Sequence, residues 1–465
     1  MLINFFAFCV IIITYDRWIM KKVFQYILIF IITVSALFFS LVLTAMIPRS
    51  AVENKVKESL YFYKKHSGID RIKIKRVDTY IHYYADTRKL NILYCIDSKH
   101  PIKSILWDKY YQIVFMDSNI DFINVVERNE TPNTNYLRYW NGCMVFLRPL
   151  LTVFNMEQIY TINKIVLLIL ALILLTLLFL RSKKLAIIYL LTLLVTTSWY
   201  AAYCIESSVM FYVMFISSIL ALIIDKKNSK KSVKEVNSML FKLFFVTGIV
   251  ATFFDFLTTE ILTIFIPLIF IIIIRKEENR LGSLKKVIIF VLKACVLWLL
   301  GYGLMWVTKW VLASLILNIN AFKYVKSNLY LRFNGLQGLP SHDILYKNVI
   351  PRNLFAVPFM YYIKENIDKW EIKYLITVVI ALILFFINWK ELKNKKYLLV
   401  LLFIALTPYI RYLVLANHSY RHVMFTFRDQ IITIVILLYI LVDTFNKGLL
   451  TKKITLNFKN KKVGK

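Results

Sequence analysis

Long apolar segments separated by short polar ones make up most of the chain. This pattern predicts an all-α protein that crosses a membrane many times, because a spanning helix needs about 20 consecutive, mostly apolar residues. About ten segments meet or approach that length. We predict spans at residues 23–47, 161–180, 185–204, 206–224, 240–257, 259–274, 287–307, 373–389, 397–416 and 430–446.

Two long polar stretches interrupt this pattern, at residues 48–160 and 308–373. The first cannot cross a bilayer, because it carries 17 Lys/Arg and 12 Asp/Glu. Within it, apolar residues recur every four positions from Val52 to Leu60, which predicts an amphipathic helix on the outer surface. The second stretch opens with the apolar residues 310–317, which form a re-entrant or interfacial helix or, alternatively, an extra span.

Basic residues concentrate in the loops on one side of the predicted spans. The short turns at positions 205 and 258 carry none. Cytoplasmic loops of membrane proteins are rich in Lys and Arg, so we predict that both termini are cytoplasmic and that both long polar stretches are extracytoplasmic. The basic regions, with 3, 5, 5, 4 and 7 Lys/Arg respectively, are residues 181–184, 225–239, 275–286, 390–396 and the tail 447–465.

Composition supports a multi-pass protein whose first partner is the lipid bilayer. Hydrophobic residues make up 59% of the chain, and the mean hydropathy is +0.62. A net charge of +32 would indicate nucleic-acid binding in a soluble protein. Here the basic residues lie mainly between apolar segments, so we predict no nucleic-acid partner. The abundant Lys, Ile and Asn are typical of an AT-rich bacterial genome, and we place the protein in a bacterial cell membrane.

The start of the chain and its cysteines allow two smaller predictions. Met20, followed by two lysines and an apolar run, resembles a bacterial translation start, so residues 1–19 are predicted to be an upstream artefact. The membrane domain is then 20–446. None of the five cysteines forms a CxxC pair, which leaves a zinc site unsupported. Cys95 and Cys143 share the first outer loop and are either paired or free.

Unusual polar residues gather towards the predicted outer ends of the spans. This distribution favours a site at the outer membrane boundary over a conducting path through the bilayer, which would need ionisable groups near the midplane. The residues concerned are Asp86, Asp255, Lys309, Arg332, Arg411 and the segment 417–428.

The segment 417–428 combines two His, two Arg, Asn, Ser and Thr in a predicted outward turn. Arginine side chains bind phosphate oxygens in a bidentate manner, and amide and hydroxyl groups add donors. We interpret the turn as a binding site for the phosphate of a lipid carrier; the alternative is an ordinary polar turn. The candidate phosphate ligands are Asn417, His418, Arg421, His422, Arg428 and Arg411.

Asp86 is the candidate for the reactive group, in a predicted helix of the first outer loop. A carboxylate there either deprotonates an acceptor hydroxyl or holds a divalent cation, for which we assign no ligand set. The alternative is a solvated loop acid, since the loop contains eleven other acidic residues. His82 and Asp78 are supporting groups or simple surface residues.

The segment 138–151 is aromatic, basic and apolar at once. One interpretation is a membrane-interface belt, where Trp and Tyr are favoured and Arg meets lipid headgroups. The other is that this segment packs the outer loop onto the membrane part and offers Arg138 or Arg148 to a lipid phosphate.

Three blocks, 84–92, 138–151 and 416–428, together with a weaker fourth at 254–258, resemble a group of largely uncharacterised Gram-positive membrane proteins. That group in turn resembles the GT-C superfamily of integral-membrane glycosyltransferases. The resemblance covers residues 20 to about 446. It implies a polytopic helical fold with a large first outer loop, and transfer of a sugar from polyprenyl phosphate on the outer face.

Carried over to this chain, the resemblance implies that Asp86 is the catalytic acidic residue and that the basic residues of the segment 417–428 face the carrier phosphate. The chain departs from the group at His82, where the group has a second acidic residue, and at Asn141, where it has a histidine. The first departure puts a two-carboxylate metal site in doubt. The second implies altered specificity or loss of activity.

The sequence therefore predicts a glycosyltransferase with a surface glycan, lipid or protein as acceptor. An inverting transfer needs a base for the incoming hydroxyl and positive charge for the departing phosphate, so Asp86 and the 417–428 turn must meet over one cavity. The alternatives are a transporter or flippase of lipid-linked saccharides, a polymerase or ligase of such saccharides, and an inactive relative.

Overall fold

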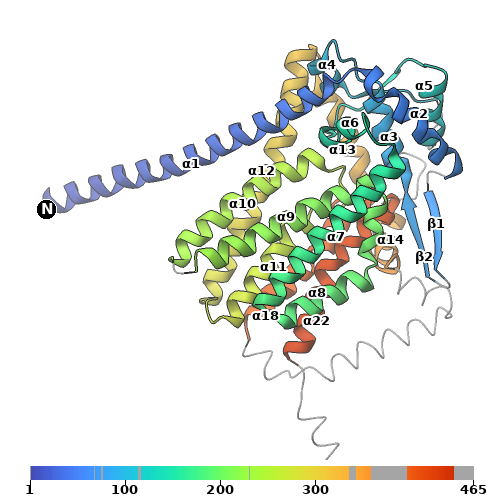
Figure 1. Cartoon of the computed structure of the whole chain (residues 1–465). Helices are drawn as coiled ribbons and strands as arrows, with labels where there is room; N and C mark the ends of the chain where they lie inside the picture. The colour runs from blue at the N-terminus through green and yellow to red at the C-terminus, as the bar shows by residue number, and fades with distance from the viewer. Residues whose placement is uncertain are drawn as a thin grey trace, which may run out of the picture.

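The computed structural model describes residues 2–66, 69–74, 77–113, 117–229, 231–334, 342–357 and 395–444. It has two parts, a bundle of apolar helices and a smaller region of residues 49–150, which we call the outer domain. In Figure 1 the outer domain covers the upper end of the bundle, and helix α1 (Leu2–Ala45) runs away to the left. Helix α1 passes through residues 15–18 without a break.

Seven helical segments among the described residues are long and apolar enough to cross a membrane, which confirms a multi-pass helical membrane protein. All seven coincide with predicted spans. They are α1 from Met20 to Ala45, α7 (Met156–Arg181), α9 (Ile205–Lys227), α10 (Val233–Phe254), α12 (Leu284–Leu317), the pair α18 (Tyr397–Ala405) and α19 (Thr407–Val414), and residues 423–443, which end with α22 (Gln430–Asp443).

The three other predicted spans are not among these seven segments. The prediction of one helix over 185–204 is wrong, because Thr197 takes a left-handed conformation (φ 47°) between α8 (Lys183–Val195) and the 3-10 helix η1 (Ser198–Tyr203). The segment 259–274 corresponds to α11 (Leu262–Glu277), which has only 16 residues and is buried almost throughout. A helix that is apolar on every face belongs inside a bundle. The predicted span 373–389 lies outside the described residues.

Helices α10 and α12 pack closely because each has a glycine at the crossing. A Cβ atom on Gly248 would lie 2.1 Å from the carbonyl oxygen of Trp298, and one on Gly301 would lie 2.2 Å from that of Phe245. Any larger residue at either position would push the two backbones apart. Small residues at membrane helix crossings serve this purpose generally.

The second long polar stretch is helical where the structure describes it. Helix α12 continues to Leu317, and α13 (Ala321–Asn334) and α14 (His342–Phe355) follow. Residues 310–317 therefore extend a spanning helix and form neither a re-entrant segment nor a separate span. The 34 residues of α12 measure about 51 Å, which exceeds the thickness of the apolar core of a bilayer.

The outer domain is mainly helical, with two small antiparallel sheets formed by β1 with β2 and by β3 with β4. The predicted amphipathic helix is confirmed as α2, but its apolar residues Val52, Val56 and Leu60 are buried against the protein. The elements are α2 (Arg49–Lys65), β1 (Ile69–Ile74), β2 (Val77–His82), α3 (Tyr83–Tyr94), α4 (Pro101–Trp107), β3 (Lys109–Tyr110), α5 (Ser118–Glu127), β4 (Thr134–Asn135) and α6 (Met144–Leu150).

The segment 138–151 forms the seam between the outer domain and the bundle. The indole N–H of Trp140 donates to the carbonyl oxygen of Met305 in α12 (2.9 Å). The backbone N–H of Gly142 donates to the carbonyl oxygen of Phe253 in α10 (3.0 Å). A Cβ atom on Gly142 would lie 2.5 Å from that same oxygen, so the close approach requires glycine.

The predicted cytoplasmic loops meet at the opposite end of the bundle, which we call the inner end. Two carboxylates tie these loops together, and the shared end agrees with the predicted topology. The pairs are Asp225 with Arg181 (2.8 Å), Arg275 (2.7 Å) and Arg280 (2.6 Å), and Asp443 with Lys184 (2.9 Å) and Lys395 (3.1 Å).

Candidate functional site

Asp86 lies in the first turn of α3 and is buried where the outer domain meets the bundle, with 1% of its surface exposed. It accepts hydrogen bonds from the Tyr160 hydroxyl (2.9 Å) and from the backbone N–H groups of Ile205 (2.7 Å) and Glu206 (2.9 Å). Asp86 therefore caps α9, whose first N–H groups favour a negative charge. Burial raises the pKa of Asp86, and the Lys89 ammonium and these hydrogen bonds oppose that shift.

A buried lysine balances the negative charge at this place. The Lys89 ammonium forms an ion pair with the Glu206 carboxylate, and its nitrogen lies 4.4 Å from the centre of the Phe256 ring. Burial alone would lower the pKa of Lys89, but nearby Cys143, Glu206 and Asp86 raise it above its ordinary value. The lysine is therefore charged, and the cluster holds one cation between two carboxylates.

A second buried cluster is centred on Arg411 in α19. Its guanidinium donates to both carboxylate oxygens of Glu260 (2.7 and 2.9 Å) and to the carbonyl oxygen of Leu257 (2.7 Å). The Asp429 carboxylate lies 3.3 Å from the Nε atom of Arg411. This arginine thus joins the turn after α10 to the segment before α22, a bidentate ion pair of the kind suited to a buried position.

Asp255, one residue beyond the end of α10, connects the two clusters. Its carboxylate accepts hydrogen bonds from the backbone N–H and hydroxyl of Thr258 (both 2.8 Å) and from the Tyr302 hydroxyl (3.3 Å). Burial raises the pKa of Asp255 to about 7, and the carboxylates of Glu260 and Glu206 act in the same direction. The carboxylates of both clusters therefore influence one another.

The predicted phosphate-binding turn consists of α20 (Ala416–Arg421), α21 (Val423–Thr426) and the 3-10 helix η2 (Phe427–Asp429). The His418 and His422 rings lie 4.5 Å apart, and the Nε2 atom of His418 is 2.7 Å from the carbonyl oxygen of Leu257. The candidate ligands differ in exposure: Asn417, His418, Arg411 and Arg428 are buried, His422 is half-buried and Arg421 is exposed.

Asp86 and Arg428 approach a common point, Cys204 at the start of α9. Cys204 is buried and precedes Ile205, whose N–H donates to Asp86. Burial raises the pKa of the Cys204 thiol to about 12; the Asp86 carboxylate acts in the same direction, and the Arg428 guanidinium opposes it. The charges of Arg428 and Asp86 therefore both act on Cys204, whereas Arg421 is exposed.

The arginines of the seam are engaged in contacts within the protein. Arg148 is fully buried and donates to the carbonyl oxygens of Ile47 (2.6 Å) and Leu93, which ties the end of α1 to α3. Burial lowers the pKa of Arg148 to about 10. Arg138 donates to the side-chain oxygen of Asn328 (3.1 Å). The phosphate-binding role predicted for these two arginines stays a prediction.

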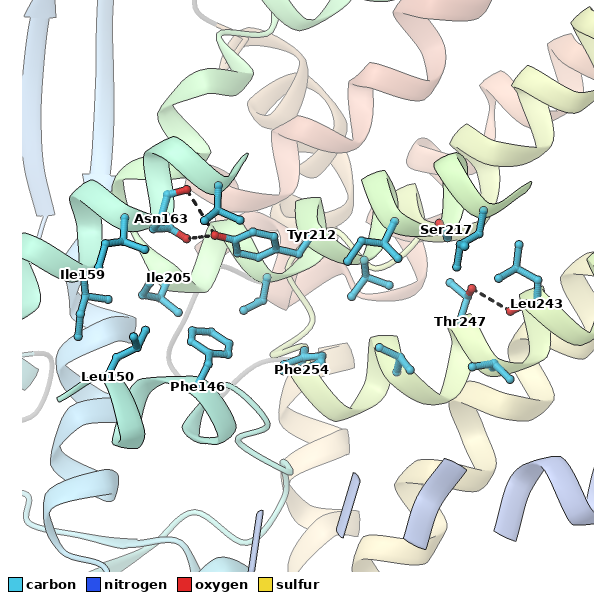
Figure 2. A pocket seen from close by; sticks show the side chains of 18 residues that line it. Phe146, Leu150, Ile159, Asn163, Ile205, Tyr212, Ser217, Leu243, Thr247 and Phe254 are labelled. Atoms are coloured by element: carbon cyan, nitrogen blue, oxygen red, sulfur yellow. Dashed lines mark hydrogen bonds between the residues drawn. The ribbon is translucent and has the colours of Figure 1, made fainter. Parts of the chain in front are cut away.

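An apolar groove of about 430 Å³ lies between α6, α7, α9 and α10. Figure 2 shows aliphatic and aromatic side chains from these four helices pointing into it. Its polar members bond within the protein: the Tyr212 hydroxyl donates to the side-chain oxygen of Asn163 (2.7 Å), and the Thr247 hydroxyl donates to the carbonyl oxygen of Leu243 (2.9 Å). The groove therefore presents an apolar wall.

One residue, Ile205, belongs both to the lining of the groove and to the surroundings of Asp86. Ile205 lines the outer end of the groove, and the N–H of the same residue donates to Asp86. Along α9 the lining runs from Ile205 to Leu220, a distance of about 22 Å at the rise of an α-helix. These dimensions suit a hydrocarbon chain that lies within the membrane and carries a polar group at its outer end.

Five residues of the two clusters were not among the predicted site residues: Tyr160, Lys89, Glu206, Glu260 and Asp429. A signal existed for Glu206 and Glu260, because acidic residues beside apolar spans are costly unless partnered. Nothing in the local pattern distinguishes Lys89 from the other lysines of its loop, and its partner Glu206 is distant in sequence.

Several other predictions concern His82, Arg332, metals and cysteines. His82 ends β2 directly before α3, and Arg332 lies in α13; their side chains lie outside the described part of the structure. Among the described residues, no group of three or more His, Cys, Asp and Glu is arranged to hold a metal ion. Cys95 and Cys143 are free thiols, so they do not form the alternative disulfide.

No family model, curated protein or solved structure matches the chain.

Proposed function

We propose that this protein is a membrane glycosyltransferase that moves a sugar from a polyprenyl-phosphate donor to a cell-surface acceptor on the outer face. The observation that carries the proposal is the double role of Ile205, which lines the apolar groove and donates its N–H to Asp86. In this scheme the prenyl chain occupies the groove, and the phosphate and sugar lie at the junction of the two charged clusters.

Asp86 has the properties of a general base in this scheme. Burial raises its pKa towards the working range of an acid–base group. Two of its three hydrogen-bond donors are backbone groups of α9, and the third is the Tyr160 hydroxyl, which a side-chain rotation removes. The acceptor hydroxyl takes the place of Tyr160 and transfers its proton to Asp86 as it attacks the anomeric carbon.

The departing phosphate needs positive charge near the same point. The oxygen of the acceptor bonds to the anomeric carbon as the bond from that carbon to the phosphate oxygen breaks, so the phosphate leaves as an anion. Arg428 acts electrostatically on Cys204 and Lys89 on Glu206, the two residues that flank Ile205. These two cations are our candidates for stabilising the leaving group.

The test is transfer of label from polyprenyl-phosphate sugars in membranes that contain the protein. Asp86→Asn is expected to lower transfer at least about 100-fold, the usual contribution of a general base. The matched control is Asp97→Asn, an acidic residue of the same domain whose side chain is 53% exposed; it should leave transfer unchanged. Gel filtration of both purified variants checks that they are folded.

Two outcomes reject the proposal. Full transfer by a folded Asp86→Asn variant removes the carboxylate from the mechanism. A complete lack of transfer by the unmodified protein, with every polyprenyl-phosphate sugar supplied, rejects the enzyme and favours a carrier of lipid-linked saccharides.

A further inference from the structure

The inner end of the bundle contains a second pocket, of about 550 Å³, between α1, α10, α11 and α12. About half of its lining residues are apolar, and seven of the 21 are Lys or Arg. Among the described residues that line it, none is acidic. The lysines that line it are Lys22, Lys234, Lys242, Lys286 and Lys293.

Three of these lysines repel a fourth, Lys22. Lys22, near the start of the span in α1, experiences the positive charges of Lys234, Lys242 and Lys293. Two arginines that line the pocket are bonded to carboxylates outside its lining: Arg275 to Asp225, and Arg280 to both Asp225 and Glu278. An anion within the pocket would be attracted by several positive charges at once. The pocket is therefore electrostatically suited to a ligand with more than one negative charge.

The depth of the lysines distinguishes a lipid from a soluble anion. Lys242 lies nine residues after the start of α10, and Lys293 lies nine residues after the start of α12. Nine residues of helix span about 14 Å, so the Cα atom of each lysine lies about that far along its helix from the inner end. Lysine at such a depth extends its charge towards the lipid headgroups.

The apolar half of the pocket continues from these lysines towards the membrane interior. The Phe241 and Phe290 rings, 5.5 Å apart, line it together with Leu297. Helix α1 borders it and is itself loosely packed: only 6% of the most apolar 18-residue stretch of its span is buried. The pocket thus has a cationic part, an apolar part and a neighbouring helix that faces mainly lipid.

We propose that this pocket binds an anionic phospholipid of the inner leaflet, with its phosphates at the lysines and the start of its acyl chains against Phe241, Phe290 and Leu297. Basic pockets between spanning helices on the cytoplasmic side recognise such headgroups. A headgroup with two phosphates matches five lysines better than one with a single phosphate. The site is at the opposite end of the bundle from Asp86 and does not depend on the proposed glycosyltransferase activity.

Native mass spectrometry of the purified full chain, with one lipid added at a time, tests the proposal. Binding is expected to be tightest for cardiolipin, weaker for phosphatidylglycerol and weakest for phosphatidylcholine. Each lysine near an anionic lipid contributes about fivefold to binding. The triple variant Lys22→Gln, Lys242→Gln, Lys293→Gln should therefore bind cardiolipin about a hundredfold more weakly.

The matched control removes three charges from the same end but outside the pocket: Lys183→Gln, Lys227→Gln, Lys285→Gln. It should change binding less than about fivefold, the effect of a single lysine. An equal loss in pocket and control variants, equal binding of phosphatidylcholine, or displacement of the lipid by excess inorganic phosphate would each overturn the proposal. If the triple pocket variant does not fold, Lys293→Gln alone, with an expected loss of about fivefold, decides in the same assay.

Discussion

The outer and inner ends of the bundle both gather charged residues, but they do so in opposite ways. At the outer end, Lys89 pairs with Glu206, and Arg411 pairs with Glu260, all of them buried. At the inner end, five lysines line one pocket, and no acidic residue is among its described lining. The outer clusters pair their charges internally, whereas the lysine pocket, which shares the inner end with the paired carboxylates Asp225 and Asp443, offers positive charge to an external partner.

This difference indicates which interactions stabilise the charged side chains in each region. A buried ion pair depends on its own partner, because the loss of one member leaves the other desolvated and unpaired. A partly hydrated lysine near a membrane surface depends little on any single neighbour. The two outer clusters should therefore be sensitive to single substitutions, and the lysine pocket at the inner end should be sensitive mainly to its ligand.

The largest expected effect comes from breaking a pair at the outer end. Lys89→Met would leave the carboxylates of Glu206 and Asp86 buried without their cation. We expect the free energy of unfolding to fall by about 3–5 kcal/mol. The measurement is the thermal denaturation midpoint of the purified protein in detergent.

A double variant controls for the loss of packing at this position. Lys89→Met combined with Glu206→Met removes both charges and should recover most of the lost stability, since apolar residues of similar volume often replace a buried ion pair without cost. A single variant as stable as the unmodified protein would contradict the pairing described for the outer end.

An intermediate effect is expected from pH. The pKa of Asp255 in the folded protein is about 7, above the ordinary 3.8. At a pH between these two values, the Asp255 carboxyl is therefore protonated in the folded protein and ionised in the unfolded chain. The stability contributed by Asp255 is present below pH 4 and is lost as the pH rises through 7. The loss should be at least about 1.4 kcal/mol, the equivalent of one pKa unit.

The measurement compares denaturation midpoints of the unmodified protein and Asp255→Asn at several pH values from 4 to 8. Asparagine keeps an acceptor for the Thr258 N–H but does not titrate. The difference between the two proteins should change steadily with pH, in favour of the variant at high pH. Parallel curves would show that Asp255 has an ordinary pKa.

The smallest effect is expected at the inner end. Lys293→Gln, measured without added lipid, should change the free energy of unfolding by no more than about 0.5 kcal/mol. Relief of repulsion from Lys22 acts in the stabilising direction. The thermal midpoint should match that of the unmodified protein under the conditions used for Lys89→Met. A loss as large as that of Lys89→Met would remove the contrast between the two ends.

Local hydropathy predicted most of the spans because the length of apolar helix that a bilayer requires is a property of each segment alone. The rule failed at two segments, for different reasons. Helix α11 is short and surrounded by other helices, and α8 ends where Thr197 takes a left-handed conformation. The continuation of α12 to Leu317 was missed because its outer turns contact the outer domain, where Lys309 pairs with Asp108 (3.0 Å).

The candidate site was predicted only in part. Asp86 was predicted as the reactive acid of the outer loop and Arg411 as a costly charge near the outer end of a span, and both are buried in charged clusters. Their partners were not predicted, because Glu206 and Glu260 belong to different segments of the chain. Nor could any single segment reveal the apolar groove, which four helices form together.

The sequence by itself determined that this chain is a multi-pass helical membrane protein, where most of its spans lie and which loops are basic. These properties follow from the apolar length and charge of individual segments. Only the tertiary structure decided that Asp86 caps α9, that Lys89 is held between carboxylates, that a groove runs along α9 from the Asp86 cluster, and that a lysine pocket lies at the inner end of the bundle. Burial and ion pairing depend on which distant segments meet, and no local pattern contains that information.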